Sequence, residues 1–292
     1  MESDDALRRL TFLMIQEDFF MFRISCFADE ISPKLEQQLQ VMHELDIHYL
    51  ELRTVWDKNV LQLSLDEARR LKQIFDENDV HVSSIGSPIG KVDIDCNFEE
   101  YLERFDHAIT LAKIFETPYI RIFSFYHGEH SLDECRQKVL SRLRIMLDIA
   151  KRSGVVLLME NEAGIYGQKS VRCQDIYEQM HDMSFLGVID PSNYVVAGED
   201  PMDSLRRVHR YVEYVHIKDS IHGTGEIVVA GKGDGKIEEI LDFLRYHEGM
   251  FVSLEPHLRE AGANRGFSGI ELFRMDHAAL TALLQKLGIS YQ

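Results

Sequence analysis

The sequence predicts an α/β fold in which eight parallel strands close into a (β/α)8 TIM barrel, preceded by an N-terminal helical extension. Strand-like and helix-like runs alternate eight times along the 292 residues. The strand-like runs are short and rich in Val, Ile, Leu, Met and Phe, as strands buried on both faces of a parallel sheet are. In the second half of the chain, four successive runs each end in a carboxylate or an imidazole. A barrel accounts for this pattern because the C-terminal ends of its strands meet at one mouth.

The individual elements follow from the apolar pattern. We expect strands at 22–27, 48–53, 81–86, 119–125, 155–160, 185–190, 212–217 and 251–255. Between them, apolar residues spaced three and four positions apart predict helices. We expect these near 33–45, 65–78, 98–116, 131–153, 171–183, 202–210, 236–247 and 272–287. Five residues are suited to cap helix N-termini, namely Ser32, Ser64, Asn97, Ser131 and Asp200, and a proline follows the first and the last of them. Gly154 is suited to end a helix.

A doubly wound, nucleotide-binding sheet is the competing α/β fold. The segment Arg23–Asp29 reads RISCFAD, so no GxGxxG motif follows the first strand, and no GxxxxGK[ST] motif occurs. Without either phosphate-binding loop this alternative has no support. No Pro-, Gly- or Ser-rich linker interrupts the pattern, so we expect residues 22–292 to form one barrel domain.

Residues 1–21 read as an amphipathic helix. Acidic residues lead the segment, and Glu17 and Asp18 interrupt its apolar part, so it does not have the form of a signal peptide. We expect it to cover the bottom of the barrel or to contact a partner subunit in a homodimer or homotetramer. Met21 is an alternative start, which would make the segment dispensable.

The composition narrows the classes of partner. The formal net charge is −17, and a surface this acidic repels phosphate backbones and anionic lipids. We therefore expect no nucleic-acid or membrane partner, and no apolar stretch is long enough to span a bilayer. The four cysteines are widely spaced and form no CxxC pair, which argues against a disulfide framework or a zinc ribbon. A cytoplasmic location is expected.

Glu160, Asp190, His216 and Glu255 end four consecutive predicted strands. Carboxylate and imidazole are ligands that hard or borderline divalent ions accept. We therefore predict one divalent metal ion per chain. Mn²⁺ is the first expectation because oxygen ligands dominate, with Zn²⁺, Co²⁺ or Mg²⁺ as alternatives. Three carboxylates leave the site negative around such an ion, which suits a neutral polyol or hydroxyketone substrate.

The same residues predict a reaction. A divalent ion with open coordination positions polarises a carbonyl group. Glu160 and Glu255 come from the first and last of the four strands and are expected on opposite sides of the ion. One glutamate can remove a proton next to the carbonyl and the other can return it, through an enediolate. This predicts an isomerase or epimerase of a ketose or sugar phosphate.

Nine short motifs give the chain a resemblance to a known family. They are DEIS at 29–32, YLELR at 49–53, WDKNV at 56–60, SSIGSPIGK at 83–91, ENE at 160–162, DPSN at 190–193, HIKD at 216–219, GKGDG at 231–235 and SLEPHL at 253–258. On these, from about Phe22 to His257, the chain resembles the xylose isomerase-like barrel superfamily, in its sugar phosphate isomerase/epimerase branch. The resemblance implies a metal held by the residues that match the four predicted ligands, with the two glutamates as an acid/base pair.

Seven further residues are expected to bind substrate. They are Arg53, Trp56, Glu162, Asn193, Lys218, Asp219 and His257. Arg53 and Trp56 follow the second strand and offer a charged clamp and an apolar wall for a sugar. Lys218 lies two positions beyond His216 and should face the same side of its strand. Asn193 occupies a position at which members of the family that the chain resembles often have a histidine. Lys91 and Lys232, in loops that contain glycine, are candidate phosphate contacts.

Three other functions remain open. A metal-dependent dehydratase, a lyase acting on an inosose or a dehydroshikimate-like ring, would begin with the same proton removal. An abasic-site endonuclease would need three metals and more histidine ligands, whereas the second strand ends in Glu51 and Arg53 and Asn193 replaces an expected histidine. A non-catalytic sugar-binding barrel would not need all four ligands.

Overall fold

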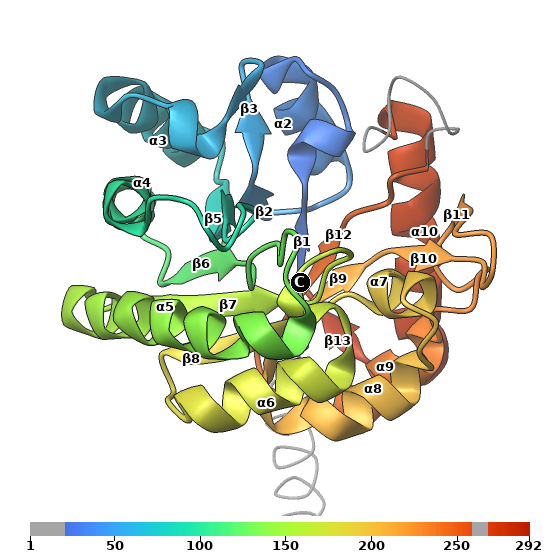
Figure 1. Ribbon diagram of the computed structural model, residues 1–292. Helices are drawn as coiled ribbons and strands as arrows, with labels where there is room; N and C mark the ends of the chain where they lie inside the picture. Colours follow the sequence, from blue (N-terminus) through green and yellow to red (C-terminus); the bar gives the residue numbers. More distant parts are fainter. Residues whose placement is uncertain (1–20, 259–267) are drawn as a thin grey trace, which may run out of the picture.

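The protein forms a barrel of parallel strands surrounded by helices, as Figure 1 shows for the computed structural model. The structure describes residues 21–258 and 268–292. The predicted helical extension therefore lies outside the described residues, except that Met21 is the first residue of strand β1. The predicted (β/α)8 fold class is confirmed.

The sheet runs in the order β13-β1-β12-β9-β8-β7-β6-β5-β2. Its strands are β1 (Met21–Cys26), β2 (Tyr49–Leu52), β5 (His81–Ile89), β6 (Tyr119–Ile122), β7 (Val156–Glu160), β8 (Phe185–Ile189), β9 (Val212–Ile217), β12 (Phe251–Leu254) and β13 (Ser290–Tyr291). Each neighbouring pair is parallel. Strand β2 also packs against β1, so the sheet curls until its ends meet. All eight predicted strands have a counterpart here.

Helices form the outer layer in Figure 1. They are α2 (Leu35–Glu44), α3 (Leu65–Glu77), α4 (Phe98–Ile114), α5 (Leu132–Ser153), α6 (Ser170–Met180), α7 (Pro191–Val196), α8 (Pro201–Val208), α9 (Ile237–Leu244) and α10 (Ile270–Leu287). The side chains of Ser64, Asn97 and Ser131 each accept a hydrogen bond from the third backbone N–H of a helix. Gly154 ends α5 in the left-handed conformation, with a φ of 73°. Asp200 likewise caps the N-terminus of α8. The predicted caps are confirmed except at Ser32, because α2 begins at Leu35 after Lys34, whose side chain forms no cap.

Short elements fill the connections at the ends of the strands. They are the 3₁₀ turns Ala28–Glu30, Val60–Gln62, Tyr166–Gln168 and His209–Tyr211, the antiparallel pair β3 (Thr54–Val55) and β4 (Lys58–Asn59), and the antiparallel pair β10 (Asp219–Ser220) and β11 (Ile227–Val228). Strand β6 ends at Ile122, before the predicted end at residue 125, and Phe125 itself has a left-handed φ of 66°, which is not a strand conformation. Helix α7 was not predicted, since its six residues are too few for a periodic signal.

The barrel interior changes character along its axis. Leu158, Val188, Tyr214 and Phe251 make an apolar cluster. Glu160 and His216 lie two residues further along β7 and β9 than Leu158 and Tyr214, and Glu255 lies four residues beyond Phe251, directly after β12. The interior therefore becomes polar toward the C-terminal mouth, where barrel active sites lie. Within the described ranges, no helix combines the length and apolar character needed to cross a membrane.

Candidate metal centre

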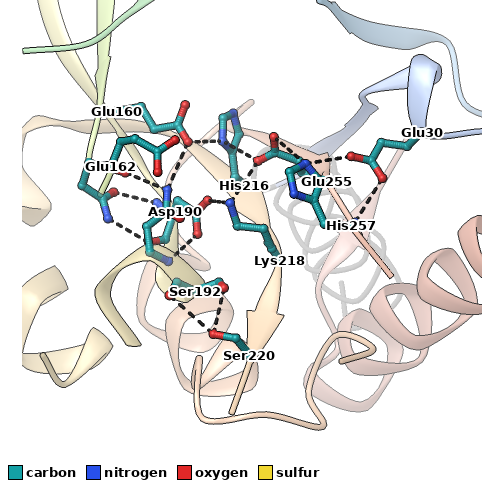
Figure 2. Close-up of polar contacts among 12 residues, drawn as sticks. Glu30, Glu160, Glu162, Asp190, Ser192, His216, Lys218, Ser220, Glu255 and His257 are labelled. Atoms are coloured by element: carbon teal, nitrogen blue, oxygen red, sulfur yellow. Dashed lines mark hydrogen bonds and ion pairs between the residues drawn. The ribbon is translucent and has the colours of Figure 1, made fainter. Parts of the chain in front are cut away.

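The four predicted ligands lie together at the C-terminal mouth. Glu160 is the last residue of β7, Asp190 follows β8, His216 is in β9 and Glu255 follows β12. Each offers a ligand atom, and these atoms all lie within 4.8 Å of one another. All four side chains are buried. Figure 2 shows His216 between Glu160 and Glu255, with Asp190 below them.

Backbone contacts fix the position of Asp190. It is the N-cap of α7, so one carboxylate oxygen accepts the backbone N–H of Asn193 at 3.0 Å, and Pro191 occupies the first helical position. The Asn161 amide bonds to both backbone groups of Asp190, each at 2.9 Å. This amide joins the ends of β7 and β8, so Glu160 and Asp190 are held at a fixed separation.

Glu51 orients the imidazole of His216. Its Oε2 lies 2.9 Å from Nε2 of His216, and both side chains are fully buried. The other ring nitrogen, Nδ1, lies 3.2 Å from Glu160 Oε1 and 3.4 Å from Glu255 Oε2. A ligand histidine commonly hydrogen-bonds through its second nitrogen to a carboxylate in this way. Nδ1 is therefore the nitrogen that faces the two predicted ligands Glu160 and Glu255.

Three permanent cations lie among the carboxylates. Arg121 Nη1 is 3.3 Å from Glu160 Oε2, and its Nε is 3.4 Å from Glu51 Oε1. Lys218 Nζ is 2.5 Å from Asp190 Oδ2 and 3.6 Å from Glu255 Oε2. Arg53, the third cation, contacts Glu255 from the opposite side.

Negative charge nevertheless exceeds positive charge in this cluster. Six buried or half-buried carboxylates stand against the three cations, and they belong to Asp29, Glu30, Glu51, Glu160, Asp190 and Glu255. Without an ion, the charges of Glu160 and Glu51 outweigh burial and raise the pKa of His216 well above 6.5, so a proton on this ring offsets part of the excess. A histidine that binds a metal ion is neutral, and with His216 and His257 neutral the excess is three negative charges, which one divalent ion would reduce to one. Uncompensated buried charge is costly, so the cluster favours a bound cation.

These opposing charges displace the pKa values of two predicted ligands in different directions. Burial by itself would raise the pKa of Glu160, but the charges of His216 and Arg121 outweigh burial and lower that pKa to about 2. For Asp190, burial together with the charges of Glu255 and Glu160 outweighs the opposing charge of Lys218, and the pKa rises to about 6.

The donor set fits a metal ion. Glu160 Oε2 and Glu255 Oε2 are buried and accept no hydrogen bond, with a cationic nitrogen 3.3 Å and 3.6 Å away, whereas Asp190 Oδ2 contacts the Lys218 ammonium at 2.5 Å. Buried oxygens without hydrogen bonds are rare and call for an explanation such as an ion. The four side chains together offer three carboxylate oxygens and one imidazole nitrogen within 4.8 Å of one another, and an O₃N donor set of this kind suits Mn²⁺ or Zn²⁺.

Several residues predicted to bind substrate lie near this cluster. Lys218 contacts two of the four ligands, as described above. Asn193 Nδ2 lies 3.5 Å from Glu160 Oε1 and donates to the Asn161 carbonyl at 2.8 Å. Glu162 accepts a hydrogen bond from Lys91 at 2.7 Å, and the Lys91 ammonium lies 4.3 Å from the centre of the Phe123 ring.

Asp219 and Trp56 have other neighbours. The Asp219 carboxylate accepts the backbone N–H groups of Ser220, Gly231, Gly233 and Gly235. It anchors the loop after β9, so we leave it out of the proposed substrate site. Trp56 lies in the turn between β3 and β4, where it packs against the core with the Arg70 guanidinium 6.0 Å from its ring centre. We therefore leave Trp56 out as well.

Sequence reasoning did not assign Glu30, Glu51 or Asn161 to the site. Glu51 interrupts the apolar run YLEL, and a carboxylate inside a buried strand is a signal that it needs a partner. Asn161 follows Glu160 directly, and nothing local distinguishes it from a loop residue. Glu30 stands in a 3₁₀ turn after β1, and two of its partners, His257 and Ser268, are more than 220 residues away.

The fold and the site define a class of barrel with a cluster of acids and a histidine at the ends of its strands. Residues 39–278 match the family of xylose isomerase-like TIM barrels, and the chain belongs to this family. The resemblance noted from the sequence is thereby confirmed.

Comparison with individual proteins adds three relatives. A 3-dehydroshikimate dehydratase of Bacillus anthracis is 18% identical over 182 residues, which span 62% of this chain and 65%, just under two thirds, of that protein. The crystal structure of a D-tagatose 3-epimerase-like protein has a TM-score of 0.75 at 15% identity, covering 91% of this chain and 98% of its own. The IOLI protein, with a zinc atom in its crystal structure, has a TM-score of 0.69 at 16% identity, covering 92% and 97%. At these identities, the structural likeness shows the fold alone.

Proposed function

We propose that the protein is a metal-dependent isomerase or epimerase of a ketose or ketose phosphate. The observation that carries this proposal is the placement of Glu160 and Glu255 on opposite sides of His216. Their oxygens lie 3.2 Å and 3.4 Å from the same ring nitrogen, Nδ1. Two carboxylates that face each other across one centre are suited to remove a proton from one face of a substrate carbon and to return it from the other.

The bound ion would be held by Glu160, Asp190, His216 and Glu255, and it would supply Lewis-acid polarisation of the substrate carbonyl. Lys218 and Asn193 line the same cluster and would bind substrate hydroxyl groups. Arg53, Arg121 and Lys218 each form an ion pair with a carboxylate. Since none of these three cations is left to bind a phosphate group, we favour an unphosphorylated substrate. Lys91, at the rim and paired with Glu162, is the residue we would assign to a phosphate.

The test is a substrate screen in D₂O. Metal content is first measured on protein purified without added metal or chelator, and we expect about one ion per chain. Protein loaded with Mn²⁺, Zn²⁺, Co²⁺ or Mg²⁺ is then incubated with ketoses, ketose phosphates and cyclitols. We expect deuterium at the carbon next to the carbonyl of the converted substrate. Turnover without solvent deuterium would refute proton transfer through the glutamates.

A dehydratase is the second candidate, and a specific contact favours it. The Lys218 ammonium lies 2.5 Å from Asp190 and 3.6 Å from Glu255, so a cationic proton donor stands beside a proposed base. Burial opposes the charge on Lys218, but the carboxylates of Asp190 and Glu255 outweigh it and raise the pKa of this lysine. The charged amine there could hydrogen-bond to a departing hydroxyl and stabilise the negative charge that develops on it. Appearance of an ultraviolet-absorbing enone or aromatic product from an inosose or from 3-dehydroshikimate would identify this reaction.

A further inference from the structure

A second group of ligand atoms adjoins the metal centre. Glu30, Glu255 and His257 each offer one, and these atoms also lie within 4.8 Å of one another. Glu255 belongs to both groups. Figure 2 shows Glu30 and His257 on the side of Glu255 that faces away from Glu160. Judged by residue type alone, these two groups could hold two metal ions at the barrel mouth, with Glu255 as a ligand of both.

The guanidinium of Arg53 lies within this second group. Its Nη1 is 2.8 Å from Glu255 Oε1, its Nη2 is 3.1 Å from Glu30 Oε1, and its Nε is 2.8 Å from Asp29 Oδ2. All three nitrogens therefore face carboxylates. The ring of Phe27 lies 4.4 Å from the guanidinium carbon, and the Arg53 side chain is only 17% exposed. Arginine keeps its charge at every accessible pH, and its planar fork suits several carboxylates at once.

This contact makes the two oxygens of Glu255 unequal. Oε1 accepts from Arg53 and lies 3.3 Å from His257 Nε2. Oε2 accepts no hydrogen bond and faces His216 Nδ1 at 3.4 Å. A carboxylate with one oxygen fixed in this way cannot rotate to offer both oxygens to one ion.

Glu30 contacts both the Arg53 guanidinium and the backbone of His257. Its Oε2 accepts the backbone N–H of His257 at 3.0 Å and the Ser268 hydroxyl at 2.8 Å, and its Oε1 lies 2.9 Å from the His257 ring. His257 has a left-handed φ of 48°, a conformation that costs free energy for a residue other than glycine and needs support from its surroundings. Glu30 supplies this support and is itself fully buried.

We infer that the Arg53 guanidinium occupies the place of a second cation, and that Arg53 is the positioning residue that turns Glu255 Oε2 toward the metal ion. The inference rests on the proposed metal-dependent function. It assigns Arg53 to Glu255 and not to substrate, and it makes the centre mononuclear. Outer residues that orient metal ligands typically contribute 10- to 100-fold to metal affinity.

The test is a Zn²⁺ titration of chelator-stripped protein against a chromophoric competing chelator. We expect one ion per wild-type chain and an affinity about 10- to 100-fold lower in Arg53→Met. Arg53→Lys keeps the charge but cannot reach three carboxylates at once, so its affinity should lie between the two. Arg69→Met removes an exposed arginine that pairs with Asp66, and it should bind as the wild type does.

A second pair of variants separates positioning from a general loss of structure. Glu30→Gln should weaken Zn²⁺ binding less than Arg53→Met does. The double variant should bind no more weakly than Arg53→Met alone, because Glu30 acts through Arg53. Circular dichroism and melting of the metal-free proteins check folding, and Arg53→Lys carries the test if Arg53→Met does not fold.

The outcomes are distinct. Wild-type affinity and stoichiometry in both Arg53 variants would overturn the inference and leave the metal-dependent function standing. Two ions per wild-type chain would overturn the mononuclear assignment. No uptake of Zn²⁺ or Mn²⁺ by the wild-type protein would overturn the metal-dependent function and the inference together.

Discussion

Asp276 in α10 should make the stability of the protein depend on pH. Its side chain is 1% exposed. One carboxylate oxygen accepts the backbone N–H of Ala230 at 2.8 Å, and the other, Oδ2, has no hydrogen-bond partner in the described chain. Burial, together with the charges of Glu30 and Asp219, raises the pKa of Asp276 from 3.8 to about 7. We therefore expect Asp276→Asn, which keeps the shape and the acceptor without the charge, to stabilise the protein at neutral and higher pH.

The direction and the size of this stability change follow from the linkage between proton binding and folding. A carboxyl whose pKa is raised in the folded state binds its proton more tightly there, so its stabilising effect is full below pH 3.8 and is lost as pH rises to about 7. A shift of roughly three units corresponds to about 4 kcal/mol at 1.36 kcal/mol per unit. The asparagine leaves a buried NH₂ group without a partner, at a cost of about 1–3 kcal/mol. The net gain should be about 1–3 kcal/mol at pH 8.

The assay is urea unfolding of both proteins at pH 5 and pH 8. Relative to the wild type, Asp276→Asn should have a higher free energy of unfolding at pH 8, and this gain should be smaller at pH 5. Asp148→Asn, at an exposed position of α5, is the matched control and should show little change between the two pH values. A stability difference that is the same at both pH values, or larger at pH 5, would refute the reasoning.

Three further predictions concern the site and its loop. Glu255→Gln should lower turnover by about 10²- to 10⁴-fold with little change in far-ultraviolet circular dichroism, since it removes an acid/base group; wild-type turnover would take Glu255 out of the mechanism. Glu51→Gln should weaken Zn²⁺ binding by about 10- to 100-fold because it loosens His216, and unchanged affinity in a chelator competition would contradict this role. Gly233→Ala should destabilise the protein by about 1–3 kcal/mol, because its Cβ would lie 2.4 Å from Asp219 Oδ1; an unchanged melting temperature would show that the loop yields.

The strands and the residues at their ends could be predicted because their signals are local. A buried parallel strand is an unbroken apolar run, and the polar residue that ends it reaches the mouth of a barrel whatever its neighbours are. Glu160 and Asp190 end such runs, His216 lies one residue before the end of β9, and Glu255 follows β12 directly. The pattern therefore located the four predicted ligands without knowledge of any contact between them.

The direction in which long side chains turn was not predictable in this way. Arg53 follows β2, so sequence reasoning placed it at the mouth as a substrate clamp. In the fold its guanidinium faces Asp29, Glu30 and Glu255 instead. Asp219 lies beside Lys218 in the sequence, yet its carboxylate is surrounded by backbone N–H groups of a loop that begins 12 residues later. Most of the charged groups and N–H groups that these two side chains contact belong to segments distant in the sequence, so local patterns do not reveal them.

The sequence alone determined the barrel, its strand ends and a centre of three carboxylates and one histidine, because hydrophobic periodicity and strand polarity act over a few neighbouring residues. Only the tertiary structure decided which partner orients each ligand. Glu51 meets His216 across 165 residues of chain, and Arg53 meets Glu255 across 202. Such contacts depend on the closure and register of the whole sheet, and the balance of buried charge that they set is a property of the assembled barrel.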